Sequence, residues 1–364
     1  MMTIALRLAG RGLGRTAPNP AVGAVIADEA TGEVIARGWT QPGGRPHAET
    51  EALRRAGARA RGKTMYVTLE PCSHHGKTPP CADAVIDAGL ARVVVGVADP
   101  DPRVSGRGLD RLRAASIRVE RGLLGAQAHW VTRGHIARVA ERRPFVQLKM
   151  ATDAAGEVPM GHAGAPTWVT GELARAHGQL LRARADAILI GRGTLVADDP
   201  QLTCRLPGLG ARSPVRVLLA GHGMLPPRRR LFSGEGPSVW VFVGASSVGE
   251  PAPAGVRLFA VPSVGGRLWL PAVLEALVGE GVTRLLVEGG PALWRAFAEA
   301  GLVDEVVHYR AGHDGACAGG TPTVESHASE AGLDIVRRLA PGISLRLADR
   351  RLIGDDELSV YRRT

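Results

Sequence analysis

One histidine, two cysteines and one glutamate stand in a pattern that could bind and use a metal ion. The sequence reads Pro46-His47-Ala48-Glu49, then Leu69-Glu70-Pro71-Cys72, then Pro80-Cys81. A histidine and two cysteines are a common zinc ligand set, and three protein ligands leave the fourth tetrahedral position open, as in catalytic zinc sites. We therefore predict that His47, Cys72 and Cys81 hold one Zn²⁺ per chain.

Glu49 has the residue type and the position needed to move protons at such a site. It follows His47 by two residues, so it can reach a water on the metal without being a ligand itself. Zinc lowers the pKa of its water to about 7, and a glutamate can carry that proton to departing ammonia. Cys81 begins a predicted helix, whose N-terminus lowers the cost of ionising a thiol. The pattern predicts hydrolytic deamination of a heterocyclic amine.

Other histidines and the overall charge leave alternatives open at this point. His74 and His75 lie in the loop between the two cysteines and could compete as ligands, or contact substrate or solvent. The net charge of +10 permits nucleic-acid binding, so a tRNA base deaminase is a rival hypothesis. However, the arginines are scattered and few aromatic residues are available for base stacking. A phosphorylated small substrate accounts for the charge equally well, and we expect no nucleic-acid partner.

Length and composition indicate a globular protein with two domains. Single cores usually stop growing near 250–300 residues, and this chain has 364, of which 45% are hydrophobic and 22% charged. No apolar run is long enough for a membrane span, and arginines interrupt the N-terminal segment where a secretory signal would need an apolar stretch. We expect a cytoplasmic protein without a membrane partner, in which cysteines serve metal binding or chemistry rather than disulfides.

The elements expected around these residues alternate between strands and helices, which is typical of a layered α/β domain. Helical periods and end signals indicate helices at 2–14, 48–60 and 81–90. Apolar and β-branched runs indicate strands at 21–27, 32–39, 64–70, 91–100 and 116–124. His47 and Cys81 then stand at helix starts, and Cys72 stands at a strand end.

The second half repeats this alternation without resembling the first half. An Arg-rich helix over 126–144 runs into Pro144, and a new strand over 145–151 follows, so we place the domain boundary there. Further helices are expected at 172–185, 270–281 and 291–301. Further strands are expected at 186–193, 215–221, 238–244, 282–290 and 304–310. The sequence thus predicts two α/β domains, 1–143 and 144–364.

The first domain resembles a known family of deaminases. The order HAE, PC and a second Cys is similar to the cytidine deaminase superfamily, although here eight residues, SHHGKTPP, separate the cysteines. With TAPNPAVGAVI, TLEPCSHHGKTPPC and VADPDPRVSGRG, it resembles the pyrimidine deaminase of riboflavin biosynthesis. The resemblance implies a three-layer α/β/α domain that deaminates 2,5-diamino-6-ribosylamino-4(3H)-pyrimidinone 5′-phosphate. It also implies that Asn19 and Lys77 contact this substrate.

In the same family the deaminase is often fused to an NADPH-dependent reductase, and the resemblance continues through the second half to the bifunctional RibD family. Its matching segments are Lys149, Ala151, Trp168–Thr170, Leu181–Ala183, Gly191–Thr194, Asp198–Pro200, Leu202–Arg205 and Val287–Pro291. The resemblance implies a dihydrofolate-reductase-like α/β domain that reduces the ribosyl group to ribityl. It implies that NADPH contacts Ala151, Trp168, Thr194, Asp198 and Gly290. It implies that substrate contacts Arg182, Leu202, Arg205 and Glu288.

Two features of the second half bear on its cofactor. Gly289-Gly290-Pro291 lies between a predicted strand and a predicted helix, where backbone N–H groups can approach a phosphate. No complete GxGxxG follows a strand, so a Rossmann domain is not supported. The family's pattern is broken at Ala155, at Pro166 and at Ala220-Gly221, and each change removes a polar partner worth about 1 kcal/mol. A deaminase with a non-catalytic second domain is therefore an alternative, and we expect a homodimer or homotetramer.

Overall fold

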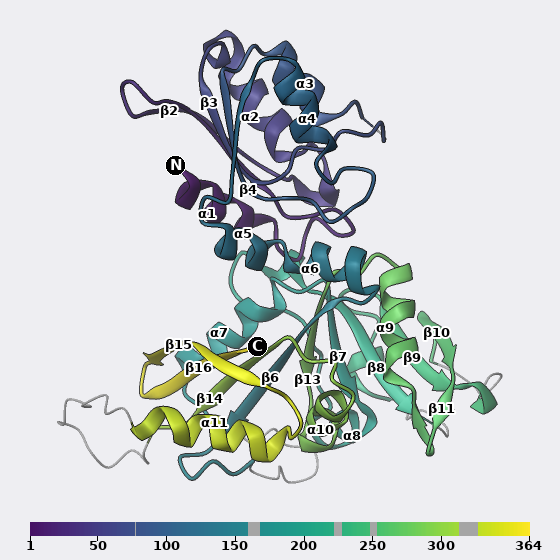
Figure 1. Ribbon diagram of the computed structural model, residues 1–364. Coiled ribbons are helices and arrows are strands. Elements are labelled where there is room, and N and C mark those ends of the chain that lie inside the picture. Colours follow the sequence, from purple (N-terminus) through teal and green to yellow (C-terminus); the bar gives the residue numbers. More distant parts are fainter. Residues whose placement is uncertain (77, 159–167, 222–227, 248–252, 313–326) are drawn as a thin grey trace. The chain divides into compact units, whose positions relative to one another are not determined.

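The chain folds into two compact units, shown in Figure 1 as a computed structural model. Unit 1 comprises Met1–Pro144 with Gly281–Thr283, and unit 2 comprises Phe145–Glu280 with Arg284–Thr364. The structure describes residues 1–76, 78–158, 168–221, 228–247, 253–312 and 327–364. Each unit contains its own sheet and its own buried core.

Unit 1 is built on a five-stranded sheet with the strand order β2-β1-β3-β4-β5. Its strands are β1 (Gly23–Asp28), β2 (Glu33–Trp39), β3 (Thr64–Leu69), β4 (Arg92–Val97) and β5 (Arg118–Arg121). The strand β1 runs antiparallel to β2 and β3, whereas β3, β4 and β5 are parallel. Because parallel strands end at the same edge of a sheet, the segments after β3 and β4 leave the sheet side by side. These segments contain Cys72 and Asp99.

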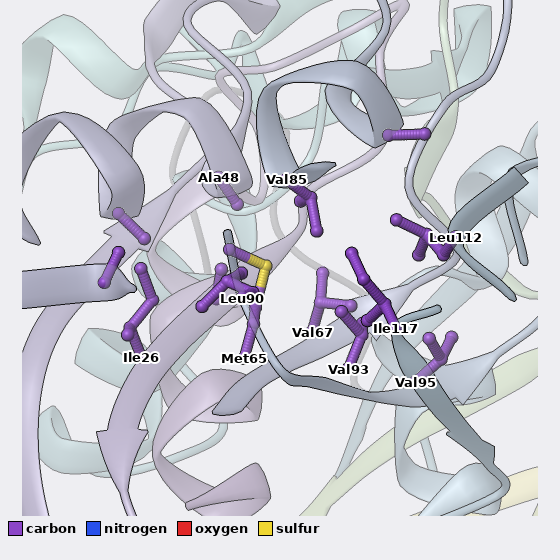
Figure 2. Packing of buried hydrophobic residues seen from close by; sticks show 14 of the residues in the cluster. Ile26, Ala48, Met65, Val67, Val85, Leu90, Val93, Val95, Leu112 and Ile117 are labelled. Atoms are coloured by element: carbon purple, nitrogen blue, oxygen red, sulfur yellow. The ribbon is translucent and has the colours of Figure 1, made fainter. Parts of the chain in front are cut away.

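Helices cover both faces of this sheet. They are α1 (Met2–Gly12), α2 (Ala48–Ala56), α3 (Cys81–Asp87), α4 (Arg107–Ala114), α5 (Gly125–Val131) and α6 (Arg133–Ile136). Side chains alternate between the faces along each strand. Ile26, Met65 and Val93 join the core beneath α2, α3 and α4 (Figure 2), whereas Val25 and Val94 pack with α1. The predicted three-layer α/β/α fold of unit 1 is therefore confirmed.

Two glycines set how closely helices approach the sheet of unit 1. A Cβ atom at Gly23 would lie 1.9 Å from the carbonyl oxygen of Ala5 in α1. A Cβ atom at Gly38 would lie 2.2 Å from the carbonyl oxygen of Ala48 in α2. Only glycine tolerates backbone contacts this close. The Gly38 contact fixes the first turn of α2, which carries Glu49.

Unit 2 is built on a nine-stranded sheet with the strand order β10-β9-β8-β7-β13-β6-β14-β16-β15. Its strands are β6 (Phe145–Thr152), β7 (Ala187–Gly191), β8 (Val215–Gly221), β9 (Val239–Gly244), β10 (Val256–Val261), β13 (Arg284–Glu288), β14 (Glu305–Arg310), β15 (Leu345–Ile353) and β16 (Asp356–Arg363). The seven strands from β10 to β14 in this order are parallel, and β16 and β15 are antiparallel. A separate ribbon pairs β11 (Ser263–Val264) with β12 (Arg267–Leu268).

The helices of unit 2 connect these strands. They are α7 (Glu172–Arg182), α8 (Arg192–Asp198), α9 (Leu270–Gly279), α10 (Pro291–Glu299) and α11 (His327–Leu339). Among the described residues of both units, short 3₁₀ turns occur at Pro42–Gly44, Gly57–Ala60, Gly210–Arg212, Arg230–Phe232 and Ala245–Ser247. In the part of the chain that the structure describes, none of the helices has the length and apolar character needed to cross a bilayer.

Two predicted elements were wrong in extent. The strand expected over 186–193 ends at Gly191, and the chain turns at once into α8. The single helix expected over 126–144 is divided into α5, α6 and a π-helical turn, Ala137–Glu141. Between α5 and α6 the hydroxyl of Thr132 donates to the carbonyl oxygen of Ala128 at 2.7 Å. Such a bond from a threonine to the carbonyl group four residues earlier often bends a helix.

Several elements had no counterpart among the predicted ones. The helix α4 follows a segment with two prolines and one glycine and has a second glycine, Gly108, in its first turn, which masked its helical period. The strands β10, β15 and β16 and the helix α11 were not predicted either. β15 and β16 are rich in arginine, so they lack the continuous apolar pattern of a buried strand. The remaining predicted helices and strands occur, with ends that differ by a few residues.

Candidate active sites

Three elements of unit 1 bring one imidazole and two thiols together. His47 is the residue before the first turn of α2, Cys72 lies in the turn after β3, and Cys81 is the first residue of α3. His47 Nδ1 lies 3.3 Å from Cys81 Sγ and 3.7 Å from Cys72 Sγ. All three possible ligand atoms lie within 4.8 Å of one another. The three residues singled out in the sequence therefore meet at one point.

The electrostatics of this cluster fit a divalent cation. A hydrogen bond with the Cys81 thiol, a second with His47 and one from the backbone N–H of Cys81 lower the pKa of Cys72 to about 4. The hydrogen bond with Cys72 and burial hold the pKa of Cys81 well above its ordinary value. A bound cation would stabilise both thiolates at once, and a histidine with two thiolates is a set that zinc prefers.

One detail of the expected electrostatics was wrong. The sequence pattern implied that the N-terminus of α3 would favour ionisation of Cys81 itself. Instead, the first backbone N–H of that helix, at Cys81, points at Cys72 Sγ at 3.2 Å. The helix N-terminus therefore stabilises the thiolate of Cys72, which comes from a different element.

Glu49 lies in the first turn of α2 and is almost completely buried, with 4% of its surface exposed. Burial is the largest cause that raises the pKa of Glu49, to about 7, and the negative charge of Cys72 raises it further. The positive charge of His47 and a hydrogen bond with Cys81 act in the opposite direction. A carboxyl group with this pKa can both accept and donate a proton near neutral pH.

Of the two other residues predicted at this site, the structure describes only Asn19. Asn19 is half-buried, and its amide Nδ2 donates to the carbonyl oxygen of Gly44 at 2.9 Å, in the segment before His47. Its predicted contact with the pyrimidine remains a prediction. Lys77 lies outside the described residues. Glu70, which was not singled out in the sequence as a functional residue, is buried in the turn after β3 that carries Cys72, residues 70–73, here called the ligand turn.

A second cluster of charges lies at the carboxyl ends of the parallel strands of unit 2. Glu288 ends β13 and forms a bidentate pair with Arg182, with Nε–Oε1 and Nη2–Oε2 distances of 2.8 Å. The third guanidinium nitrogen donates to the carbonyl oxygen of Thr203 at 3.0 Å. Lys149 is the neighbour of Glu288 in the pairing of β6 with β13. Ligands of open parallel sheets bind at this edge.

Lys149 was named from the sequence only as a matching position and was given no role. Burial lowers its pKa, while Glu288 raises it. Its Nζ lies 5.8 Å from the centre of the Tyr309 ring, whose hydroxyl is 2.6 Å from Nδ1 of His177. A lysine inside a mostly apolar strand was the local signal, but the sequence does not reveal that Glu288 lies beside it in the sheet.

Two residues of unit 2 that are predicted to contact substrate, Leu202 and Arg205, differ in burial. Leu202 is 2% exposed and packs in the core, and its φ of 59° lies in the left-handed region. Any contact of Leu202 with substrate would therefore use its backbone. Arg205 is exposed, and its backbone N–H donates to Oε1 of Gln179 at 2.9 Å. Its guanidinium group thus lies at the surface and interacts electrostatically with Arg182 and Glu288.

The predicted cofactor contacts occur on separate elements. Ala151 is in β6, Thr194 and Asp198 are in α8, and Gly290 is the residue before α10. Trp168 is 63% exposed, and the guanidinium carbon of Arg175 lies 5.0 Å from the centre of its ring. These cofactor contacts remain predictions. Of the positions that depart from the family pattern, Pro166 lies outside the described residues.

Comparisons with known proteins match both halves. Residues 1–97 match the cytidine and deoxycytidylate deaminase zinc-binding region, and residues 144–313 match the RibD C-terminal domain. Riboflavin biosynthesis protein RibD of Escherichia coli (strain K12) is 41% identical over 319 residues, which cover 85% of this chain and 86% of the relative. The protein of the same name from Bacillus amyloliquefaciens is 37% identical over 312 residues, 85% of this chain and 82% of the relative.

Solved structures agree with these relatives. A diaminohydroxyphosphoribosylaminopyrimidine deaminase/5-amino-6-(5-phosphoribosylamino)uracil reductase from Thermotoga maritima matches with a TM-score of 0.81 and 33% identity. That match covers 100% of this chain and 97% of the other. RibD of Acinetobacter baumannii matches with a TM-score of 0.78 and 32% identity, over 100% of this chain and 98% of that protein. The chain therefore belongs to the RibD family, the bifunctional deaminases and reductases of riboflavin biosynthesis, as its sequence motifs predicted.

Proposed function

We propose that this chain deaminates 2,5-diamino-6-ribosylamino-4(3H)-pyrimidinone 5′-phosphate in unit 1 and reduces the ribosyl group of the product to ribityl in unit 2. The observation that supports the first step most directly is the convergence of His47, Cys72 and Cys81 within 4.8 Å, together with the buried Glu49 in the first turn of the helix that follows His47. A base deaminase acting on tRNA shares that cluster, but the match to RibD proteins over both halves favours the riboflavin pathway.

In the first step, Glu49 carries protons, and His47, Cys72 and Cys81 hold the metal. Zinc bound by His47, Cys72 and Cys81 would supply a Lewis acid that makes water nucleophilic near neutral pH. Glu49 accepts a proton from the attacking water, whose oxygen bonds to the ring carbon that carries the 2-amino group. Glu49 then donates a proton to the amino group, and the carbon–nitrogen bond breaks to release ammonia. Its burial keeps bulk water away from this proton transfer.

In the second step, NADPH would supply a hydride to C1′ of the ring-opened sugar, and a proton from solvent adds to the nitrogen on C1′. The residues of unit 2 then bind and orient the sugar phosphate. Arg182 donates two hydrogen bonds to Glu288 and a third to Thr203, so its main task is to hold Glu288 at the end of β13. Of the two arginines predicted to contact substrate, we therefore assign the exposed Arg205 to the phosphate. Gly290 and the N-terminus of α10 suit a phosphate of the cofactor.

One experiment separates the two activities. Purified protein is incubated with the diaminopyrimidinone ribotide, with and without NADPH, and ammonia release and NADPH consumption are measured independently. We expect ammonia in both reactions and NADPH oxidation only after deamination. Ammonia release without oxidation of NADPH or NADH at any cofactor concentration would show that unit 2 does not act as a reductase. The absence of ammonia would refute the proposed first step.

Arg205→Ala is expected to weaken binding of the ribotide in unit 2 by about ten- to hundredfold, because hydrogen bonds to a charged group contribute about 1.5–3 kcal/mol. The measurement is the KM for NADPH oxidation with the deaminated ribotide as substrate. Ammonia release should not change, because independent sites behave additively. Arg346→Ala, which removes another exposed arginine of unit 2, serves as the control. An unchanged KM in Arg205→Ala would place the phosphate elsewhere.

Two further expectations concern the cell and the assembly. We place the enzyme in the cytoplasm and expect a dimer or tetramer of identical chains. Cell fractionation and light scattering of the purified protein test these two proposals.

A further inference from the structure

A buried carboxylate lies two residues before the ligand Cys72. Glu70 is 3% exposed and follows β3 directly. Its Oε1 accepts the backbone N–H of Gly108 at 3.2 Å, and its Oε2 accepts those of Gly106 at 3.2 Å and Asp99 at 3.4 Å. All three donors belong to the segment that connects β4 to the first turn of α4, residues 99–108, here called the clamp loop.

Glu70 caps α4 from a distance in sequence. The residue before the helix is Gly106, which has no side chain to satisfy the first N–H groups of the helix, and its φ is 78°. The carboxylate of Glu70 supplies acceptors for these donors instead, and its negative charge faces the positive end of the helix dipole. The capping residue thus comes from the turn that carries Cys72.

The same loop contacts the ligand turn through its backbone. A Cβ atom at Gly108 would lie 2.3 Å from the carbonyl oxygen of Pro71, the residue between Glu70 and Cys72. Only glycine permits this approach. On the other side of Cys72, the hydroxyl of Ser73 donates to the carbonyl oxygen of Arg103 in the clamp loop at 3.2 Å. Cys72 therefore stands between two residues whose side chains bind the same loop.

Side chains of the clamp loop itself and of α6 hold the clamp loop in place. Asp99 Oδ1 accepts the backbone N–H of Asp101 at 2.9 Å and lies 3.0 Å from Nε2 of His135 in α6. Both Asp99 and His135 are buried. Asp101 in turn accepts the backbone N–H of Arg103 at 2.9 Å. Internal hydrogen bonds thus fix the conformation of the clamp loop, so residues that bind the loop are themselves held in place.

We propose that Glu70 is a positioning residue for the metal centre, which holds Cys72 at its ligating position by binding the ligand turn to the clamp loop. This inference rests on the proposed ligand set of His47, Cys72 and Cys81. Partners that orient ligands commonly change metal affinity or activity by about 10- to 100-fold when they are removed. The backbone around Cys72 is otherwise fixed mainly on the side of α3, where Ala82 N–H donates to the Cys72 carbonyl oxygen at 3.1 Å.

The test compares Glu70→Gln with Glu120→Gln. The first variant keeps the side-chain size but turns one acceptor into a donor that faces a backbone N–H. The second makes the same chemical change in unit 1 at a surface pair with Arg92. Three quantities are measured on the full chain: the rate of zinc transfer to a chelator, the visible spectrum of the Co²⁺-loaded protein, and kcat and KM for ammonia release.

We expect Glu70→Gln to release zinc about 10- to 100-fold faster than wild type, with altered cobalt bands and a lower kcat but an unchanged KM. Glu120→Gln should match wild type in all three. A Glu70→Gln protein that only melts at lower temperature, yet keeps the wild-type zinc release and cobalt spectrum, would overturn the proposal. If Glu70→Gln does not fold, the test uses Ser73→Ala, which removes the more exposed hydrogen bond between the ligand turn and the clamp loop. We expect this variant to release zinc about fivefold faster than wild type, which corresponds to about 1 kcal/mol because each 1.4 kcal/mol changes an equilibrium constant tenfold.

The failure of this inference differs from failure of the proposed function. Wild-type protein that contains no zinc would remove the ligand set itself, and the role of Glu70 with it. Wild-type protein that holds zinc, combined with unchanged zinc release in Glu70→Gln, or in Ser73→Ala where Glu70→Gln does not fold, would leave the ligand set intact and reject only the positioning role.

Discussion

Glu49→Gln is expected to reduce the rate of ammonia release by about 10²- to 10⁴-fold, which is the usual contribution of a positioned acid–base group. Glutamine fills the same buried space but cannot accept the proton of the attacking water or return it to the leaving amino group. Because Glu49 is not one of the three ligands, zinc content should remain at about one per chain. The measurements are initial rates of ammonia release and zinc analysis of the same preparations.

The control for this variant is a glutamate two residues further along the same helix. Glu51 is also buried and in the first turn of α2, but its carboxylate is bound by Arg54 and Arg55. Glu51→Gln therefore removes a neighbouring charge without touching the cluster, and deamination should stay near the wild-type rate. Turnover close to wild type in Glu49→Gln would mean that another group carries the proton.

Cys72→Ser and Cys81→Ser should each lose the metal and, with it, deamination. Each change removes a thiolate from a three-ligand site, and a serine hydroxyl is a much weaker zinc ligand. Zinc analysis should fall from about one per chain to a small fraction, and ammonia release should become undetectable. NADPH oxidation with the deaminated ribotide should persist, because that site consists of residues of unit 2.

Cys204 provides the matched comparison for the loss of a thiol. It is buried in unit 2, and its Sγ donates to the carbonyl oxygen of Gln179 at 3.5 Å. Cys204→Ser should therefore keep the wild-type zinc content. Full zinc content in both Cys72→Ser and Cys81→Ser would refute the proposed ligand set, and zinc-free wild-type protein would refute zinc catalysis altogether.

The sequence alone was sufficient for the chemistry of unit 1 because that chemistry depends on residue types at element ends. His47 and Cys81 stand at helix starts and Cys72 after a strand, and such positions follow from local periodicity and turn residues. The same local rules predicted most helices and strands. They failed where polar or glycine-rich residues interrupt the pattern, as at α4 and in the strands β15 and β16.

Only the tertiary structure decided which distant groups meet. Glu70 binds Gly106 and Gly108, which lie 36 and 38 residues further along the chain, and Arg182 pairs with Glu288 across 106 residues. It also decided that the helix N-terminus at Cys81 stabilises the thiolate of Cys72. Local propensities specify elements, but pairings across such separations depend on how the strands are ordered and on which backbone groups burial leaves without water. Those two conditions exist only in the folded chain.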